Sequence, residues 1–373
     1  MKRLALVLAL SGCPNFDQEF DDRVAMLRDA GSDAGSLAGG AEAGGGEAAG
    51  GAAGGGATAG GGATAGGGAT CAQPFCLVER FALPSGFSND TVDCQAPVFD
   101  DLTRLRAYCW RDRKATVSVR DGGLVAASNL LLNSWPAADG RADEHWVTDS
   151  QTGFYRVLGT QHTPMPTTCG GATFTVISLF SPGPGELWAG GSGGAVCHYL
   201  PDGGQESYGV GSSGIAAIFA MDAGVWVGNN DGDIYRLDGT LESATVVGSG
   251  EVNSIHGLEP DVLYATTLDQ GVWERRSDGG WSRAFPDNQK TYNEVRVLGV
   301  DDVWAYGGRG ALMRKTAAGW APLDTNFDLG LGAPEFQVMG VRGRPGELLL
   351  TGSTFNPTTS SWDGTVVRML RGP

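Results

Sequence analysis

Several short stretches of this chain contain residue patterns that enzymes use to hold a nucleophile or a phosphate. The stretch "GGSGG" at 190–194 matches G-x-S-x-G, in which a serine such as Ser192 lies on a strand-to-helix turn. The stretch "GVGSSG" at 209–214 matches G-x-G-x-x-G, which binds a phosphate where it joins a strand to a helix. Both stretches lie between short apolar segments that resemble strands. We therefore predict tight turns here, with no catalytic serine and no cofactor.

The stretch "NNDGD" offers oxygen ligands at alternate positions, as the start of a calcium loop does. Asn229, Asp231 and Asp233 occupy those positions. The EF-hand pattern would continue with Gly and Glu, where this chain has Ile234 and Thr240. Because Asn, Asp and Gly are also the usual residues of hairpin turns, we interpret the stretch as a turn and predict no metal site.

Acid–base or glycosidic catalysis would need titratable side chains that the fold brings together. The four histidines are scattered without HxxxH or HExxH spacing, so we expect core or surface histidines. They are His145, His162, His198 and His256. A sialidase-type site would need several arginines converging on a carboxylate beside a tyrosine and an acid. Arg275, Arg296 and Arg309 are candidates, but sequence alone does not show convergence. We predict that the chain is not an enzyme.

These stretches belong to a unit that recurs about every 40 residues. Each copy has an acid or glycine, an aliphatic residue and then a bulky anchor, as in "ELWAGG", "GVWVGN" and "DVWAYG". The gaps between consecutive anchors are 36, 42, 38, 37, 41 and 45 residues. A period near 40 built of strand-like segments is typical of propellers and other repeat arrays. The anchors are Trp110, Trp146, Trp188, Trp226, Leu263, Trp304 and Leu349.

Each unit reads as four short strands joined by tight turns, with the anchor in the second strand. Such an antiparallel sheet leaves both faces under-covered, whereas radially packed copies cover each other. We therefore predict an all-β fold, a β-propeller of about seven four-stranded blades. The N-terminal "FCLVERFAL" is expected to supply the outer strand of the last blade and so to close the ring.

The units resemble the propeller repeat of two-component regulators, with its "LW.G" strand, glycine turn and "GL.RYD" strand. They resemble Asp-box and photosystem-assembly-factor propellers more distantly, through "RSDGGW" at 276–281. The resemblance is good over 171–320, fair over 321–370 and weak over 95–170. Because the sequence shows no histidine-kinase or DNA-binding segment, the signalling role of that family is not expected here.

The first residues, "MKRLALVLALSGC", have a basic start and an apolar run too short to span a bilayer. The ending "LSGC" resembles the bacterial lipobox, which implies cleavage after residue 12 and a diacylglycerol on Cys13. An ordinary secretory signal with a coincidental cysteine is the alternative. We expect a signal peptide at 1–12 and membrane contact through the N-terminal lipid only.

Residues 13–70 are expected to form a disordered linker. Its first part is acidic, and residues 31–70 contain 18 Gly and 13 Ala in 40 residues. Such a segment buries too little apolar surface to offset its ordering entropy. As a flexible coil it would span roughly 35 Å between its ends. The chain therefore divides into the signal peptide, this tether and a propeller domain at 71–373.

Six cysteines remain in the propeller domain once Cys13 is assigned to the lipid. An even number in an exported chain is consistent with disulfides, although six cysteines allow fifteen pairings. We pair Cys169 with Cys197, because these two lie apart from the others. The other candidates are Cys71, Cys76, Cys94 and Cys109. Buried free thiols are the alternative.

The composition narrows the classes of partner. The formal net charge is −16, and the propeller domain has 34 acids against 22 bases. An acidic surface repels polyanions, so we expect no nucleic acid partner. The preferred interpretation is a monomeric, lipid-anchored module of the bacterial cell envelope, at the periplasmic or surface face of the outer membrane. It would bind or scaffold an envelope protein or a glycan.

Two other functions stay open. One is a carbohydrate-active propeller enzyme, sialidase-like or lyase-like, and the other is an assembly factor for envelope proteins. Facing carboxylates or arginines in the central channel would favour the enzyme, and exposed apolar surface would favour protein binding. Loops on a rigid scaffold usually hold ligands, so we expect the ligand over the turns between second and third strands.

The candidate ligand residues lie in those turns and in a longer insertion of the last blade, "STFNPTTSSWDG" at 353–364. The alternative is that they are only polar turn residues. They are Asn229, Asn230, Asp231, Asp269, Gln270, Arg309 and Trp362.

Overall fold

The computed structural model describes most of the chain after residue 74. Every described residue belongs to one compact unit, Gly62–Pro373. The expected signal peptide, the lipid site at Cys13, the tether and Cys71 lie outside the described residues. Before residue 137 the backbone alone is described. The described ranges are 75–82, 93–101, 104–110, 115–120, 123–128, 137–141, 143–149, 153–159, 161–237, 245–246, 250–268, 271–285, 291–307, 311–323, 336–344, 347–356 and 361–371.

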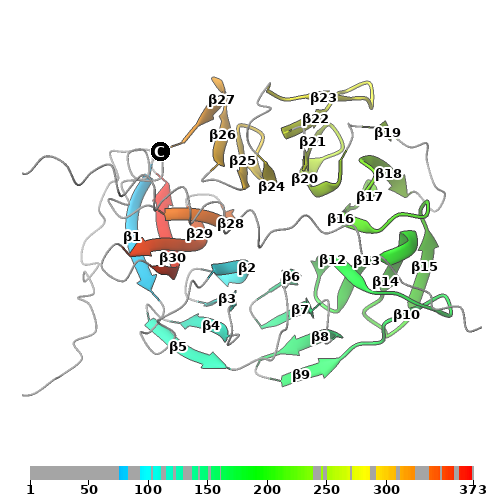
Figure 1. Cartoon of the computed structure of the whole chain (residues 1–373), viewed down its shortest axis with the longest axis horizontal. Helices are drawn as coiled ribbons and strands as arrows, with labels where there is room; N and C mark the ends of the chain where they lie inside the picture. Colours follow the sequence, from blue (N-terminus) through cyan, green and yellow to red (C-terminus); the bar gives the residue numbers. More distant parts are fainter. Residues whose placement is uncertain are drawn as a thin grey trace, which may run out of the picture. The chain divides into compact units, whose positions relative to one another are not determined.

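The described strands form seven four-stranded antiparallel sheets and one two-stranded ribbon (Figure 1). The first three sheets are β2 (Asp93–Asp101), β3 (Arg104–Trp110), β4 (Ala115–Arg120), β5 (Gly123–Ser128); β6 (Ala137–Gly140), β7 (Glu144–Asp149), β8 (Gly153–Leu158), β9 (Gln161–Pro164); and β12 (Val176–Gly183), β13 (Glu186–Gly191), β14 (Ala195–Tyr199), β15 (Gln205–Gly209). The next three are β16 (Ile215–Met221), β17 (Gly224–Asn229), β18 (Asp233–Leu237), β19 (Thr245–Val246); β20 (Val252–Glu259), β21 (Val262–Thr267), β22 (Gly271–Arg275), β23 (Trp281–Arg283); and β24 (Tyr292–Gly299), β25 (Asp302–Gly307), β26 (Ala311–Thr316), β27 (Gly319–Pro322). The ribbon is β10 (Thr168–Cys169) with β11 (Ala172–Thr173).

The last sheet joins the two ends of the described chain. It contains β28 (Phe336–Arg344), β29 (Glu347–Asn356), β30 (Ser361–Arg371) and, as its outer strand, β1 (Phe75–Ala82). The register of β1 on β30 starts with Phe75 opposite Arg371. The prediction that "FCLVERFAL" supplies this strand is confirmed.

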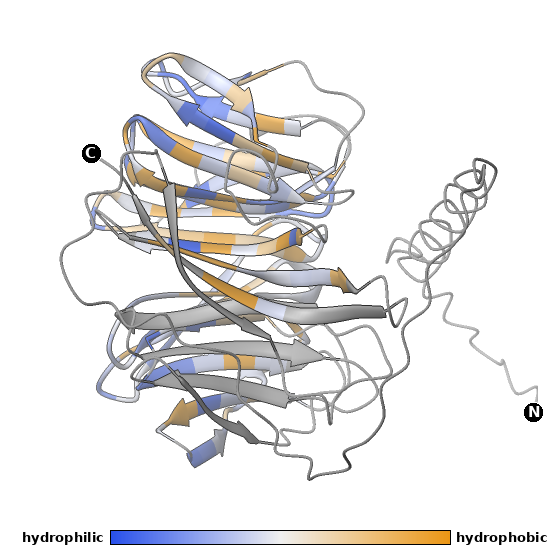
Figure 2. Ribbon diagram, turned by 90° about the vertical axis from the view of Figure 1, so that its left-hand side faces the viewer, coloured by the Kyte–Doolittle hydropathy of each residue, from blue (hydrophilic) through white to orange (hydrophobic). Residues whose placement is uncertain are grey.

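The first strands of the seven sheets contact one another in cyclic order. Strand β2 contacts β6, and the series continues through β12, β16, β20 and β24 to β28, which contacts β2 again. The first strand is therefore the inner strand of each sheet. The predicted fold class, an all-β propeller of four-stranded blades, is confirmed. Hydrophobic and hydrophilic segments alternate along the described strands, as expected where the side chains alternate between two faces (Figure 2).

The anchor residues lie on the second strand of each sheet and are buried wherever their side chains are described. Trp226, for example, packs in one cluster with Val252, Ile255 and Leu263 of the next sheet. The anchors thus join neighbouring blades. The side chain of Trp110 on β3 lies outside the described part of the chain.

The glycine two residues after an anchor tryptophan allows the next blade to approach. A Cβ atom on Gly228 would lie 2.4 Å from Cγ1 of Val252, which is the first residue of the next inner strand. A Cβ atom on Gly190 would lie 2.5 Å from Cγ2 of Ile215 in the same way. The recurring W-x-G pattern is therefore a packing requirement between blades.

The acid two residues before an anchor tryptophan also has a structural partner. In the sheet of Trp304, Arg314 on the third strand lies 5.3 Å from the tryptophan ring centroid and donates its Nε to Oδ1 of Asp302 at 2.9 Å. Two other sheets repeat this arrangement. They contain Glu144, Trp146 and Arg156, and Glu186, Trp188 and His198.

Candidate binding site on the inner strands

The stretch "NNDGD" forms the turn between β17 and β18. Asn229 is only 2% exposed, and its Oδ1 accepts hydrogen bonds from the backbone N–H of Asp231 at 3.0 Å and of Asp233 at 2.8 Å. Asn230 and Asp231 are exposed, and Asp231 accepts a hydrogen bond from Ser213. Asn229 therefore holds the turn, Asp233 is half-buried, and Asn230 and Asp231 are exposed to solvent. Within the described ranges no group of three His, Cys, Asp or Glu side chains could hold a metal ion.

The side chains of the other candidate ligand residues are not described by the structure. Asp269, Gln270 and Arg309 lie outside the described residues, as does the side chain of Trp362. The insertion at 353–364, expected as a loop, is largely strand, because β29 and β30 extend into it as a long hairpin with Trp362 opposite Phe355. The structure does not test whether any of these residues binds a ligand.

The two glycine-rich motifs join strands to strands. Ser192 begins the single turn η3 (Ser192–Gly194) between β13 and β14, and its Oγ accepts a hydrogen bond from the backbone N–H of Thr175. The "GVGSSG" stretch leads into strand β16. Neither motif precedes the helix that its chemistry needs. Nor does any described residue belong to a helix that is long and apolar enough to cross a membrane.

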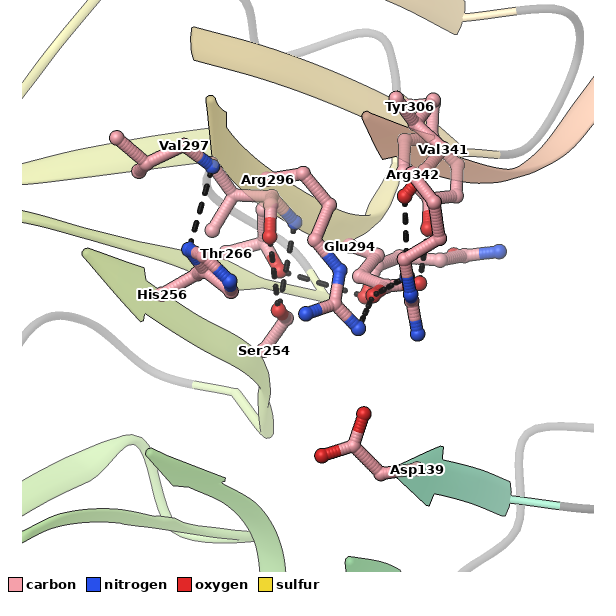
Figure 3. A network of polar contacts seen from close by, with 12 residues as sticks. Asp139, Ser254, His256, Thr266, Glu294, Arg296, Val297, Tyr306, Val341 and Arg342 are labelled. Carbon is pink, nitrogen blue, oxygen red and sulfur yellow. Dashed lines mark hydrogen bonds and ion pairs between the residues drawn. The ribbon is translucent and has the colours of Figure 1, made fainter. Parts of the chain in front are cut away.

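Charged side chains from several sheets meet at the inner strands, where sequence analysis did not group them (Figure 3). Strand β24 contributes Glu294 and Arg296, which share a face of the strand because they are two residues apart. We call the group the axial cluster. Its members are Asp139 on β6, His256 on β20, Glu294 and Arg296 on β24, Tyr306 on β25 and Arg342 on β28.

Glu294 is the centre of the axial cluster. It forms ion pairs with Arg296 and with Arg342, the latter at 3.2 Å between Oε1 and Nη1, and its Oε2 accepts a hydrogen bond from the Tyr306 hydroxyl. Burial disfavours the charged carboxylate, but the two guanidinium groups and the hydroxyl outweigh this effect and hold the pKa of Glu294 below its usual value. Glu294 is therefore ionised at neutral pH.

The two arginines retain capacity to bind an anion. Water reaches 15% of the Arg296 side chain and 13% of the Arg342 side chain, and 25% of Glu294 between them. The Nε of Arg296 is buried without a hydrogen-bond partner. Within the described part of the chain, two full positive charges thus share one directly contacting carboxylate. An arginine fork with free N–H groups is suited to a carboxylate or a phosphate.

Asp139 faces this pair from the opposite side (Figure 3). Its Oδ2 accepts a hydrogen bond from the backbone N–H of Ser181 at 2.7 Å. Among the described residues no ion pair within 4.0 Å joins it to Arg296 or Arg342. Burial raises the pKa of the Asp139 carboxyl, and the more distant arginines and backbone N–H groups offset this only in part.

His256 borders the cluster as a neutral side chain. Its Nδ1 accepts a hydrogen bond from the backbone N–H of Val297 at 3.3 Å, so the proton of the neutral ring lies on Nε2. Burial, with the positive charges of Arg296 and Arg342, holds the pKa of His256 well below its ordinary value. The histidine therefore adds no charge at neutral pH.

A sequence signal for this cluster exists in the repeat. Asp139, Arg296 and Arg342 each lie directly opposite an anchor, namely Trp146, Trp304 and Leu349. The same position holds Phe180 and Phe219 opposite Trp188 and Trp226. Charged residues seven or eight positions before an anchor thus mark the inner strands that depart from the apolar pattern. Of the arginines named from sequence, Arg296 belongs to the cluster, while Arg275 donates to the carbonyl of Pro260 at 2.8 Å.

Comparison with known proteins identifies the fold. No family model and no curated protein matches the chain. A structure described as YCF48 bound to D1 peptide has a TM-score of 0.57 at 14% identity, covering 80% of this chain and 95% of that chain. The computationally designed Ika8 protein has a TM-score of 0.53 at 12% identity, covering 76% and 98%. BamB from Moraxella catarrhalis has a TM-score of 0.49 at 11% identity, covering 79% and 97%. At these identities the likeness to the first two structures shows the β-propeller fold alone.

Proposed function

We propose that this chain is a lipid-anchored β-propeller of the bacterial cell envelope that binds a protein partner at the axial cluster. The observation that carries the proposal is the pair Arg296 and Arg342, which remain partly exposed and, among the described residues, form ion pairs only with the carboxylate of Glu294. A pair buried purely for stability would have its hydrogen-bonding groups satisfied, since burying an unmatched donor costs about 1–3 kcal/mol. A partner that supplies an acidic group would satisfy them.

A polypeptide partner is favoured over a glycan for two reasons. Leu258, near the end of first strand β20, is 45% exposed, and Val300, in the turn after first strand β24 of the next sheet, is 60% exposed. Large exposed apolar side chains suit a protein surface. In addition, the YCF48 structure of the same fold is a complex with a peptide.

The proposed location rests on the N-terminus and on one cross-link. The "LSGC" stretch would place a lipid on Cys13, and the glycine–alanine tether would hold the propeller away from the membrane. The disulfide between Cys169 and Cys197 is consistent with an oxidising compartment. A Cys13→Ser variant is expected to leave the membrane fraction, and an unmodified Cys13 in the mass spectrum of the wild type would contradict the anchor.

The protein-binding function is tested by cross-linking and affinity capture from envelope extract. The test variant is Arg296→Gln with Arg342→Gln, and the matched control is Arg276→Gln, an exposed arginine paired with Asp278 at the surface. We expect the wild type and the control to capture the same protein, and the double variant to capture at least tenfold less. Equal capture by the double variant, with its fold intact by circular dichroism, would contradict the proposal. A captured glycan without protein would also contradict it.

A sialidase-like enzyme is the second candidate, and one observation favours it. The Tyr306 hydroxyl contacts Glu294 beside two arginines, as such a site requires. However, Tyr306 is only 1% exposed, and burial raises its pKa far above the ordinary value, so it is a poor nucleophile for a substrate. Hydrolysis of a fluorogenic sialoside by the wild type, and not by Tyr306→Phe, would establish the enzyme in place of the binding module.

A further inference from the structure

We infer that the axial cluster binds a ligand carboxylate between Arg296 and Arg342 on one side and the protonated carboxyl of Asp139 on the other. The inference rests on the proposed function and specifies its chemistry: the ligand is a carboxylate, and its binding takes up one proton.

The arginine side is a cationic half-site that is already preorganised. Glu294 holds Nη2 of Arg296 and Nη1 of Arg342, and the latter nitrogen also donates to the Val341 carbonyl at 3.0 Å. Both guanidinium groups are thereby fixed in orientation, while Nε of Arg296 has no partner. A carboxylate that arrives at these groups meets N–H donors whose positions are already set, which lowers the entropic cost of binding.

The Asp139 side favours a shared proton. Asp139 projects from β6 toward the arginines, and no ion pair among the described residues joins them (Figure 3). A ligand carboxylate placed in this interval would be close to Asp139, and two carboxylates in contact cannot both stay ionised. Because burial already raises the pKa of Asp139, the proton is expected on Asp139, which then donates a hydrogen bond to the ligand.

No other described group at the site is expected to take up this proton. Glu294 stays ionised and His256 stays neutral for the reasons given above. The remaining charged or titratable side chains of the cluster are the guanidinium groups of Arg296 and Arg342 and the hydroxyl of Tyr306, which keeps its proton because burial raises its pKa. The proton taken up on binding therefore belongs to the pair formed by Asp139 and the ligand carboxylate.

The sign of the pH dependence follows from this assignment. Proton uptake on binding means that affinity increases as the pH falls, by at most tenfold per pH unit for one proton. The increase starts below the pKa of Asp139 in the complex and levels off below its pKa in the free protein. Below the ordinary range of carboxylic acids the ligand itself is protonated, and affinity then falls.

The test uses N-acetylglycine, which has a free carboxylate, and N-acetylglycinamide, which is the neutral control of the same shape. Binding to the full chain is followed by NMR titration from pH 4.5 to 8, and proton uptake by calorimetry in buffers of different ionisation heat. We expect N-acetylglycine to bind more tightly at low pH with uptake of about one proton. We expect the amide to bind at least tenfold more weakly.

Two variants and one further probe complete the design. Asp139→Asn keeps a side-chain N–H donor without a titrating proton, so it should bind N-acetylglycine with no pH dependence above pH 5.5. Asp278→Asn removes an exposed acid away from the inner strands and should leave the pH dependence unchanged. Binding without proton uptake, or an unchanged pH dependence in Asp139→Asn, would overturn the inference. Inorganic phosphate that binds as tightly as N-acetylglycine and independently of Asp139 would also overturn it.

The outcomes separate this inference from the proposed function. If N-acetylglycine does not bind while the arginine-dependent capture of an envelope protein persists, the carboxylate assignment is wrong and the function stands. If capture does not depend on the arginines, the proposed function fails. Binding of N-acetylglycine in that case would still show a carboxylate site.

Discussion

Two arginines lie opposite Trp304 on the two strands that flank it, and their surroundings differ. Arg314 on β26 lies over the indole ring at 5.3 Å and donates to Asp302, which also accepts from the indole N–H at 3.0 Å. Arg296 on β24 lies opposite the same tryptophan in the register of the sheet, but it shares Glu294 with Arg342 and has a buried Nε without a partner. The first arrangement recurs in other blades, whereas the second occurs at the inner strands.

This difference separates residues that build the fold from residues that are available to a ligand. The recurring acid, tryptophan and arginine satisfy one another within a blade, so each copy can be explained by packing alone. The residues of the axial cluster come from different sheets and leave hydrogen-bonding capacity unused. A repeat protein therefore indicates its candidate site at the positions where its repeat is broken.

The largest effect is expected from removing an anchor. Trp304→Ala should lower the free energy of unfolding by about 3–5 kcal/mol, because it empties a buried space in the cluster that contains Tyr306, Phe336 and Leu350. Denaturant titration followed by circular dichroism measures this loss. Trp304→Phe should lose less than half of the unfolding free energy that Trp304→Ala loses. A loss below 1 kcal/mol in the alanine variant would show that the anchors do not join the blades.

The disulfide should give the next largest effect. Cys169 on β10 of the ribbon is joined to Cys197 on β14 across a separation of 28 residues, as the sequence predicted. A loop of this size contributes about 3–4 kcal/mol through the unfolded chain. Cys169→Ser with Cys197→Ser should lower the unfolding free energy by this amount, without changing capture of the partner. An unchanged midpoint would argue against the cross-link in solution.

Substitution of Arg314 should mainly lower stability, whereas substitution of Arg296 should mainly lower ligand binding. Arg314→Gln leaves the buried Asp302 with a weaker partner, so we expect a loss of about 1–3 kcal/mol in stability and unchanged ligand binding. Arg296→Gln should lose binding and less stability, since Glu294 keeps Arg342 and Tyr306. Thermal unfolding and capture measured on both variants test the comparison. Equal effects of the two substitutions would remove the distinction between them.

The sequence predicted the fold well because the repeat carries several independent signals. The anchor positions, the glycines two residues after Trp188 and Trp226, and the closing strand at 75–82 all follow from packing within and between blades. The axial cluster was not predicted, because convergence of Asp139 with Arg296 depends on strands that are distant in the sequence. In two other sheets, Phe180 and Phe219 occupy the inner-strand position opposite the anchor. The sequence signal for the cluster is therefore a charged residue at a position that is apolar in other copies, and neither composition nor motifs detect it.

In the turns expected to bind the ligand, the sequence suggested a binding role for a residue whose role is structural. Asn229 was named as a candidate because its type suits ligands, but its carbonyl oxygen is used by the backbone N–H groups of its own turn. Residue type alone does not distinguish a polar side chain that holds a turn from one that meets a ligand. The hydrogen-bond partners make that distinction.

The smallest effect concerns Asp139 and has an unusual direction. The pKa of Asp139 is higher in the folded protein than in the unfolded chain. The free energy of unfolding therefore decreases as the pH rises from about 3.9, the pKa in the unfolded chain, to the pKa in the folded protein. Above the folded pKa the decrease stays constant. Asp139→Asn should therefore raise the unfolding midpoint slightly at pH 7 and change it little below pH 3.5. Thermal unfolding at the two pH values measures this, and destabilisation at pH 7 would show that Asp139 serves the fold.

The most direct test of the central claim is site-specific photo-crosslinking to the captured partner. A crosslinking residue at Asn293, exposed on inner strand β24 beside Glu294, is compared with one at Ala321, exposed on outer strand β27 of the same sheet. Binding at the axial cluster predicts strong crosslinks from position 293 and few from 321, with the former lost in the Arg296→Gln, Arg342→Gln background. Crosslinks from 321 alone, or crosslinks from 293 that persist in that background, would contradict it.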